Sequence, residues 1–216
     1  MNINHAVIGL DFDNTLINYD ELFYNLAGEE GLVPKDVEKT KTGIRDSIRL
    51  LGDGETKWQR LQALAYGPRM SGAVLNIGVS EFLRRCRSVK AKVHIVSHKT
   101  EFANLDETRT NLRHSAMDWM AEHGMFDHSD QGLSPRDVFF EQTRQEKLQR
   151  INSLGCTHFI DDLEEVLTEP SFPTNVIKIL YAPHRETRPV AGVAVVCDWE
   201  QIGHLIFGVA QPHGVL

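Results

Sequence analysis

The sequence predicts an α/β protein of three layers, with a central parallel sheet and a small helical insert. Short apolar runs alternate with longer amphipathic stretches, which is typical of parallel βαβ units with right-handed crossovers. Strands are expected at residues 6–12, 92–97, 137–140, 157–161, 176–180 and 193–196. Helices are expected at residues 79–89, 104–123, 142–154 and 163–167. In such a sheet the functional site lies beyond the carboxyl ends of the strands.

The segment from residue 17 to residue 76 interrupts this alternation, because it contains no expected strand. Three helices are expected there instead, punctuated by glycine and proline, at residues 19–30, 35–51 and 55–66. We interpret this insert as a small cap over the site. The α/β core then consists of residues 1–16 and 77–210, and residues 211–216 form a frayed tail.

Composition narrows the class of protein. The chain has 216 residues, 41% of them hydrophobic, and a net charge of −7, which is ordinary for a globular domain and gives no support to a nucleic-acid binder. Cys86, Cys156 and Cys197 are scattered, as expected for reduced thiols in the cytoplasm. We expect neither a signal peptide nor a membrane span, since no apolar run approaches about 20 residues. The oligomeric state is left open.

The first predicted strand ends in Asp11 and Asp13, separated by one residue. In extended backbone these two side chains share a face, and two crowded carboxylates repel unless a cation or a shared proton relieves them. The pair therefore suits a magnesium site, a nucleophile beside a general acid, or both. The alternative is a strand followed by an ordinary Asp/Asn-rich turn.

Three further polar elements follow in order. Ser97 ends an apolar strand, Lys147 lies near the start of a helix, and Asp161 and Asp162 end another apolar strand. Together with Asp11-x-Asp13-x-Thr15, this order resembles the haloacid dehalogenase-like (HAD) hydrolase superfamily, whose members are mostly phosphatases. The resemblance covers roughly residues 5–182 and includes the insert at the position of that superfamily's first cap type. It implies a Rossmann-like core.

The resemblance implies a role for each acid. Asp11 is the nucleophile that forms an aspartyl-phosphate, and Asp13 is the general acid that then becomes the base. Dehalogenases of the superfamily lack the second aspartate, so Asp13 favours phosphoryl transfer. Asp161 and Asp162 complete a Mg²⁺ site with Asp11 and the backbone carbonyl of Asp13. Which of the two contacts the metal is left open, and the alternative for Asp162 is a cap on helix 163–167.

The remaining candidates are expected to contact the phosphorylated substrate. By the same resemblance, Ser97 donates a hydrogen bond to a phosphoryl oxygen and Lys147 neutralises charge on the nucleophile and the phosphate. Thr15 is expected to hold the turn after the aspartates. Further candidates for substrate contact are His98, Lys99 and Arg144, for which an ordinary polar loop is the alternative.

The sequence as a whole predicts a Mg²⁺-dependent hydrolase of phosphomonoesters that acts on a small soluble metabolite. Two alternatives stay open: a phosphomutase of the same superfamily, and a non-catalytic protein that binds a phosphorylated ligand or a partner. Nothing in residues 17–76 identifies the substrate, because no motif in the insert translates into a ligand.

Overall fold

The computed structural model describes residues 6–106, 108–184 and 188–208, so the expected tail at 211–216 lies outside the described residues. The chain divides into two compact units. We call the first, made of residues 1–16, 76–98 and 125–216, the α/β unit. The second, made of residues 17–75 and 99–124, is called the helical unit.

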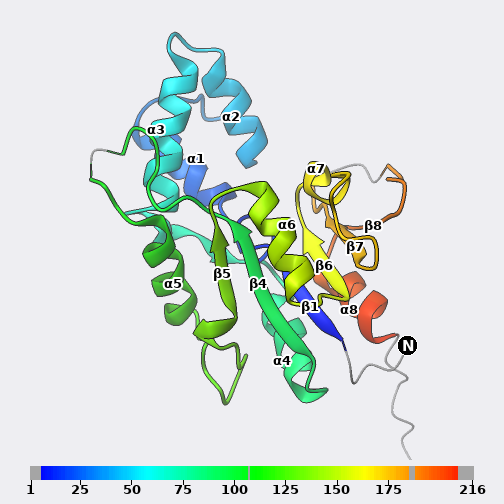
Figure 1. Cartoon of the computed structure of the whole chain (residues 1–216). Coiled ribbons are helices and arrows are strands. Elements are labelled where there is room, and N and C mark those ends of the chain that lie inside the picture. Colours follow the sequence, from blue (N-terminus) through cyan, green and yellow to red (C-terminus); the bar gives the residue numbers. More distant parts are fainter. Residues whose placement is uncertain (1–5, 107, 185–187, 209–216) are drawn as a thin grey trace, which may run out of the picture. The chain divides into compact units, whose positions relative to one another are not determined.

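The α/β unit contains a six-stranded parallel sheet, which confirms the predicted fold class (Figure 1). Its strand order is β5-β4-β1-β6-β7-β8. The strands are β1 (Val7–Leu10), β4 (Lys92–His98), β5 (Val138–Glu141), β6 (His158–Asp161), β7 (Ile177–Tyr181) and β8 (Val193–Val196). The chain runs from β1 to β4 and β5 on one side, then crosses to β6 on the other. Ligands bind at such a reversal of strand order, beyond the carboxyl ends of the strands.

Helices cover both faces of this sheet. On one face, α6 (Arg144–Ser153) and α7 (Glu164–Leu167) bury apolar side chains against Val96 and Phe159 of the sheet. On the other face, α4 (Val79–Ser88) packs against α8 (Trp199–Phe207), where the Phe82 and Trp199 ring centroids lie 5.0 Å apart. Figure 1 shows α6 in front of the sheet and α4 behind it. The short 3₁₀ helix η3 (Pro135–Asp137) leads into β5.

The helical unit contains α1 (Asp20–Glu29), α2 (Lys41–Arg49), α3 (Gly54–Tyr66), the 3₁₀ helix η2 (Met70–Gly72) and α5 (Leu112–Glu122). The prediction of no strand between residues 17 and 76 is wrong at its two ends. There β2 (Ile17–Asn18) pairs antiparallel with β3 (Val74–Leu75). Two residues are too few to show the alternation by which a strand is recognised.

Residues 99–124 group with the helical unit, although the prediction placed them in the α/β core. The reason is packing: the indole of Trp119 in α5 donates a hydrogen bond to Ala73 O at 3.1 Å. The helix expected at 104–123 begins only at Leu112. Before it, the Asp106 carboxylate accepts hydrogen bonds from the amides of Thr108 and Thr110, which competes with helix formation.

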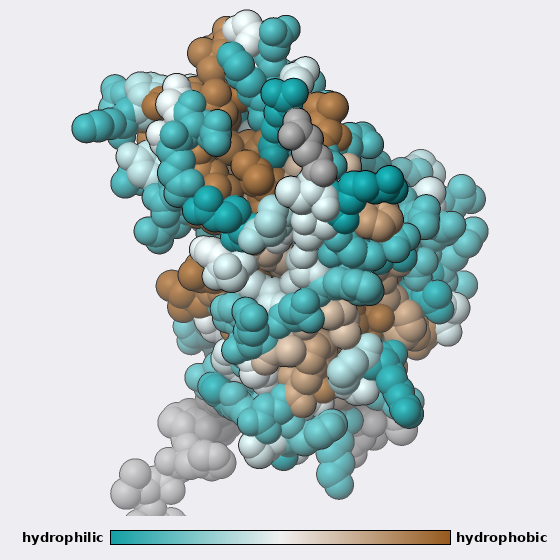
Figure 2. Space-filling model, turned by 90° about the vertical axis from the view of Figure 1, so that its left-hand side faces the viewer, coloured by the Kyte–Doolittle hydropathy of each residue, from teal (hydrophilic) through white to brown (hydrophobic). Residues whose placement is uncertain are grey.

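On the face in Figure 2, hydrophobic residues form separate patches among hydrophilic ones. Among the described residues, no helix combines the length and the apolar character needed to cross a membrane.

Gly9 in β1 allows close packing in the centre of the sheet. An added Cβ would lie 2.5 Å from Cδ2 of Phe159 on the neighbouring strand β6. We expect Gly9→Ala to lower the free energy of unfolding by about 1–3 kcal/mol, measured by urea denaturation, because Phe159 must move. The control is Gly203→Ala in α8, where the nearest atom lies 3.9 Å away. A Gly9→Ala protein as stable as wild type would contradict this account of the sheet.

Two histidines of the sheet link stability to pH. His158 is 7% exposed, and burial lowers the pKa of His158 and of His94 below the usual 6.5. At these two histidines the unfolded chain therefore binds more protons than the folded chain near pH 6, so the stability that they contribute is fully present above their unfolded pKa of about 6.5 and is lost as the pH falls below it.

We expect His158→Asn to reduce this decline, measured as the free energy of unfolding between pH 7.5 and about 5.5. The control is His128→Asn, which changes an exposed histidine and should leave the pH dependence as in wild type. The same decline in both variants would argue against His158 as a source of the linkage.

Candidate active site

Three carboxylates meet at the carboxyl ends of β1 and β6. Asp11 directly follows β1, and its amide donates to Ile160 O at 2.9 Å, which fixes it beside Asp161 at the end of β6. One carboxylate oxygen from each of Asp11, Asp161 and Asp162 lies within 4.8 Å of the others. The structure thus brings together three of the predicted metal ligands from positions about 150 residues apart in the sequence.

Lys147 bridges two of these carboxylates. Its Nζ donates to Asp11 Oδ1 at 2.6 Å and to Asp161 Oδ2 at 2.7 Å, and the residue is 1% exposed. Lys147 is the fourth residue of α6, and this helix begins with a reciprocal capping box between Thr143 and Glu146. The capping box satisfies free amides at the start of the helix and fixes its first turn, so it positions Lys147.

The electrostatics of this cluster are governed by burial and by Lys147. Burial raises the pKa of Asp11 to about 6, against the lowering effect of the Lys147 ammonium, while Asp161 and Asp13 add to the increase. Burial by itself would lower the pKa of Lys147, but the Asp11 and Asp161 carboxylates outweigh it and raise that pKa above its usual range. Three ionised carboxylates and one ammonium leave a formal charge of −2, which suits a divalent cation.

Asn76 holds the turn that follows Asp11 and Asp13. Its side-chain amide donates to Thr15 O at 2.8 Å and to Asn14 O at 3.3 Å, and its backbone amide donates to Leu16 O at 2.8 Å. Asn14 in this turn has a φ of 61°. Asn76 was not predicted as a functional residue, because a lone asparagine in a segment expected to be a helical insert carries no recognisable signal.

Thr15 belongs to the same turn and is fully buried. Its hydroxyl donates to Asp162 Oδ1 over 3.5 Å, which is long for a hydrogen bond. Asp13, two residues earlier, is half-buried. The geometry of Thr15 fits its expected role in holding the turn next to the carboxylates.

Ser97 is buried at the carboxyl end of β4, on a strand that directly neighbours β1. The next residue, His98, is exposed, and its Nε2 lies 2.9 Å from Gln142 O after β5. Lys99 belongs to the helical unit, where its Nζ lies 5.1 Å from the centroid of the Tyr66 ring. The sheet therefore fixes Ser97 next to β1, the strand that Asp11 follows.

Arg144 forms ion pairs with α7 and its carboxyl-terminal end: Nη2 contacts Glu165, and Nη1 lies 3.9 Å from Glu169 Oε2. The structure thus places Arg144 in a surface ion pair. The alternative reading of Asp162 as a helix cap is not seen, because α7 has no side-chain cap. Just before α7, the Leu163 amide instead donates a hydrogen bond to Asp161 Oδ1 at 2.9 Å.

No family model matches the chain. No curated protein matches it in sequence. Solved structures do match its fold. A haloacid dehalogenase-like hydrolase from Bacteroides fragilis is 15% identical, with a TM-score of 0.58 over 92% of this chain and 99% of the other.

A HAD family hydrolase from Deinococcus radiodurans, solved with bound phosphate and sodium, is 12% identical, with a TM-score of 0.54 over 95% and 96% of the two chains. A dehalogenase with an intermediate complex is also 12% identical, with a TM-score of 0.55 over 94% and 97%. The chain therefore has the fold of the HAD-superfamily hydrolases, as the order of its motifs predicts.

Lys147 provides a direct test of how this cluster is held. Lys147→Met leaves Asp11 and Asp161 buried without their shared cation, so we expect the free energy of unfolding at pH 7 to fall by about 3–5 kcal/mol. Added Mg²⁺ should restore part of this loss, because a cation that binds only the folded protein stabilises it. The measurement is urea denaturation with and without Mg²⁺.

The control for this test is Lys35→Met, which removes an exposed lysine and should change stability little. If Lys147→Met were as stable as Lys35→Met, Lys147 would not be the residue that holds the carboxylates together.

Proposed function

We propose that the protein is a Mg²⁺-dependent phosphomonoester hydrolase that acts on a small soluble phosphorylated metabolite. The observation that carries this proposal is the buried group of Asp11, Asp161 and Asp162, with Lys147 bonded to the first two. It lies where the strand order of a parallel sheet reverses, which is where such folds bind ligands.

In the first step, an Asp11 carboxylate oxygen attacks the phosphorus of the substrate. A P–O bond forms, the bond to the alkyl oxygen breaks, and Asp13 gives its proton to the leaving alkoxide. With a pKa of about 6, Asp11 is mostly ionised at neutral pH and needs no base. Lys147 holds the Asp11 carboxylate in place through the bond to Oδ1, which leaves Oδ2 for the attack.

In the second step, Asp13 as a carboxylate accepts a proton from water, whose oxygen attacks the phosphorus of the aspartyl-phosphate. The bond between Asp11 and phosphorus breaks, which releases phosphate, restores the Asp11 carboxylate and leaves Asp13 protonated for the next cycle. Ser97, buried beside β1, is the proposed donor to a phosphoryl oxygen.

The donors at the site fit Mg²⁺. Asp11, Asp161 and Asp162 supply hard oxygen ligands, and the cluster keeps a negative charge after Lys147 is counted. The backbone carbonyl of Asp13 is the proposed fourth protein ligand. When bound, the ion neutralises charge on the transferring phosphoryl group.

Two further observations favour phosphate over halide chemistry. Asp13 provides the proton donor that an alkoxide leaving group requires and that a halide does not. The Deinococcus radiodurans hydrolase of the same fold binds phosphate in its structure.

We also propose that the protein is located in the cytoplasm, where thiols stay reduced, because its three cysteines are free. Cys86 and Cys156 are buried, and burial raises the pKa of Cys86 to about 12 and that of Cys156 to about 11.

The test is phosphate release from a panel of sugar phosphates, nucleotides and phospho-acids, with and without Mg²⁺. We expect wild type to hydrolyse at least one compound only with Mg²⁺, and Asp11→Asn to lose at least about a thousandfold in kcat. The control is Asp36→Asn, which changes an exposed aspartate and should retain full activity. Unchanged turnover by Asp11→Asn would refute the mechanism, and no activity on the whole panel would refute the function.

A further inference from the structure

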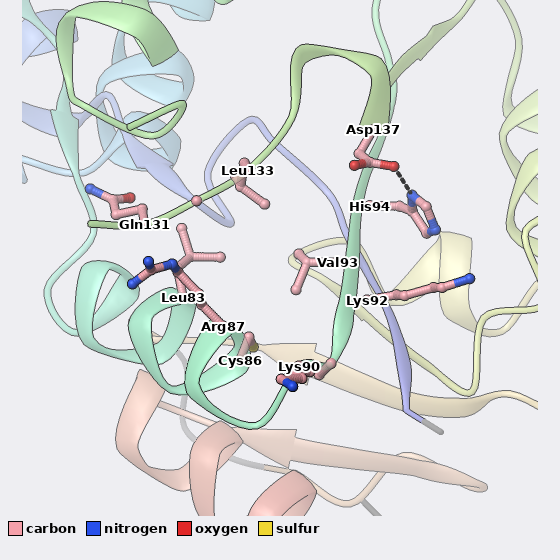
Figure 3. Close-up of a pocket in the computed structure, with 12 residues that line it drawn as sticks. Leu83, Cys86, Arg87, Lys90, Lys92, Val93, His94, Gln131, Leu133 and Asp137 are labelled. Carbon is pink, nitrogen blue, oxygen red and sulfur yellow. Dashed lines mark ion pairs between the residues drawn. The ribbon is translucent and has the colours of Figure 1, made fainter. Parts of the chain in front are cut away.

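A pocket lies in the α/β unit, at the end of β4 that is opposite to the end near the carboxylates. It has a volume of about 380 Å³, within the range of small-molecule sites. Its walls come from the carboxyl-terminal half of α4, from the amino end of β4 and from the loop before η3 (Figure 3). Because β4 runs from Lys92 to Ser97 and His98, the pocket and the carboxylate site sit at opposite ends of the same strand.

The pocket exists because β4 extends beyond its neighbour. Pairing between β4 and β5 begins at Ile95, whereas pairing between β4 and β1 already begins at Lys92. The Lys92 amide donates to Ala6 O on the β1 side. Successive residues of a strand point their main-chain groups to alternate sides. The amide and carbonyl of Val93 therefore face the side of β5, at a level that precedes the first residue of β5.

The lining of this pocket is apolar on its inner side. Leu83 and Cys86 of α4, Val93 of β4 and Leu133 of the loop contribute side chains, and three of the four are buried. In Figure 3 the Val93 and Leu83 side chains point toward one another across the pocket, whereas Lys92 points away from α4. This inner surface suits the apolar body of a ligand.

The rim carries positive charge in a chain whose net charge is −7. Arg87 packs its stem over Gly132, and its Nη1 donates to Ser129 O at 3.4 Å. The carboxylate among the lining residues is that of Asp137, and His94 Nδ1 lies 3.1 Å from its Oδ1. Within the described part of the chain, Lys90 makes no ion pair.

Lys90 also has an unusual backbone. It follows the end of α4 with a φ of 57°, a left-handed conformation in which glycine is favoured. The Ala91 amide donates to Cys86 O at 2.9 Å, the bond that closes a helix end of this kind. A lysine at this position makes the protein less stable than a glycine would, so the stability of the helix end does not account for the lysine at the pocket rim.

We propose that this pocket binds a small organic anion, with the apolar body against Leu83, Val93 and Leu133 and the anionic group at Lys90. The Val93 amide offers a hydrogen-bond donor between the two. The inference stands apart from the proposed function, because every residue that lines the pocket lies away from the carboxylate cluster.

The probe for this site is 8-anilinonaphthalene-1-sulfonate, an aromatic body with one anionic group, titrated by fluorescence into wild type and variants without Mg²⁺. We expect saturable binding with one probe per chain. Lys90→Gly should weaken it about fivefold or more, and Lys90→Glu further, because the rim loses or reverses its cation. Lys90→Gly should be at least as stable as wild type, which separates lost binding from lost folding.

The matched control is Arg109→Gly, which removes another cation from a left-handed residue, with φ of 50°, outside the pocket. It should leave binding unchanged. The proposal is overturned if Lys90→Gly and Lys90→Glu bind like wild type, if binding does not saturate, or if Asp11→Asn rather than the Lys90 variants removes it. Citrate as competitor should displace the probe from wild type, and a failure to compete would also count against an anion site.

Discussion

The structure of the α/β unit depends on one buried ammonium group. Lys147 lies between Asp11 and Asp161, and without it the sheet would end in carboxylates held close together away from water. Burying a charge is costly unless ionic partners and hydrogen bonds are in place. Removing one partner destabilises the protein by more than the complete group of charges stabilises it, because the remaining charge is left buried without compensation. The sequence around the site therefore serves two purposes: it brings acids together and it places a cation among them.

Several local features converge on that placement. The absence of a side chain at Gly9 lets Phe159 lie against β1, and the Lys147 ammonium lies 5.4 Å from the centroid of the Phe159 ring. The capping box at Thr143 and Glu146 sets the first turn of α6. Asn76, far along the chain, ties down the turn after Asp13. Each contact is ordinary, and together they fix the carboxylates relative to Lys147.

The strands of the sheet and the acids at their ends were predictable, because buried parallel strands are short apolar runs and their carboxyl ends meet at one edge. Lys147 was predicted from its position in the order of the motifs. The helix start before it was also predictable, because Thr143 and Glu146 have the Thr-x-x-Glu spacing of a capping box. Asn76 and the two-residue strands β2 and β3 were not predictable, since their contacts join distant residues without local periodicity. The ion pairs of Arg144 were not predictable for a related reason: its partners Glu165 and Glu169 lie far from it in the sequence.

The central claim is that the carboxylate held by Lys147 accepts a phosphoryl group. The most direct measurement is mass spectrometry of the protein quenched in acid during incubation with Mg²⁺ and a substrate from the panel, followed by peptide mapping. The account predicts one added phosphoryl group, on Asp11, that is absent without substrate and absent from Asp11→Asn. Phosphate release with Asp11 unmodified, or with the group on another residue, would contradict it.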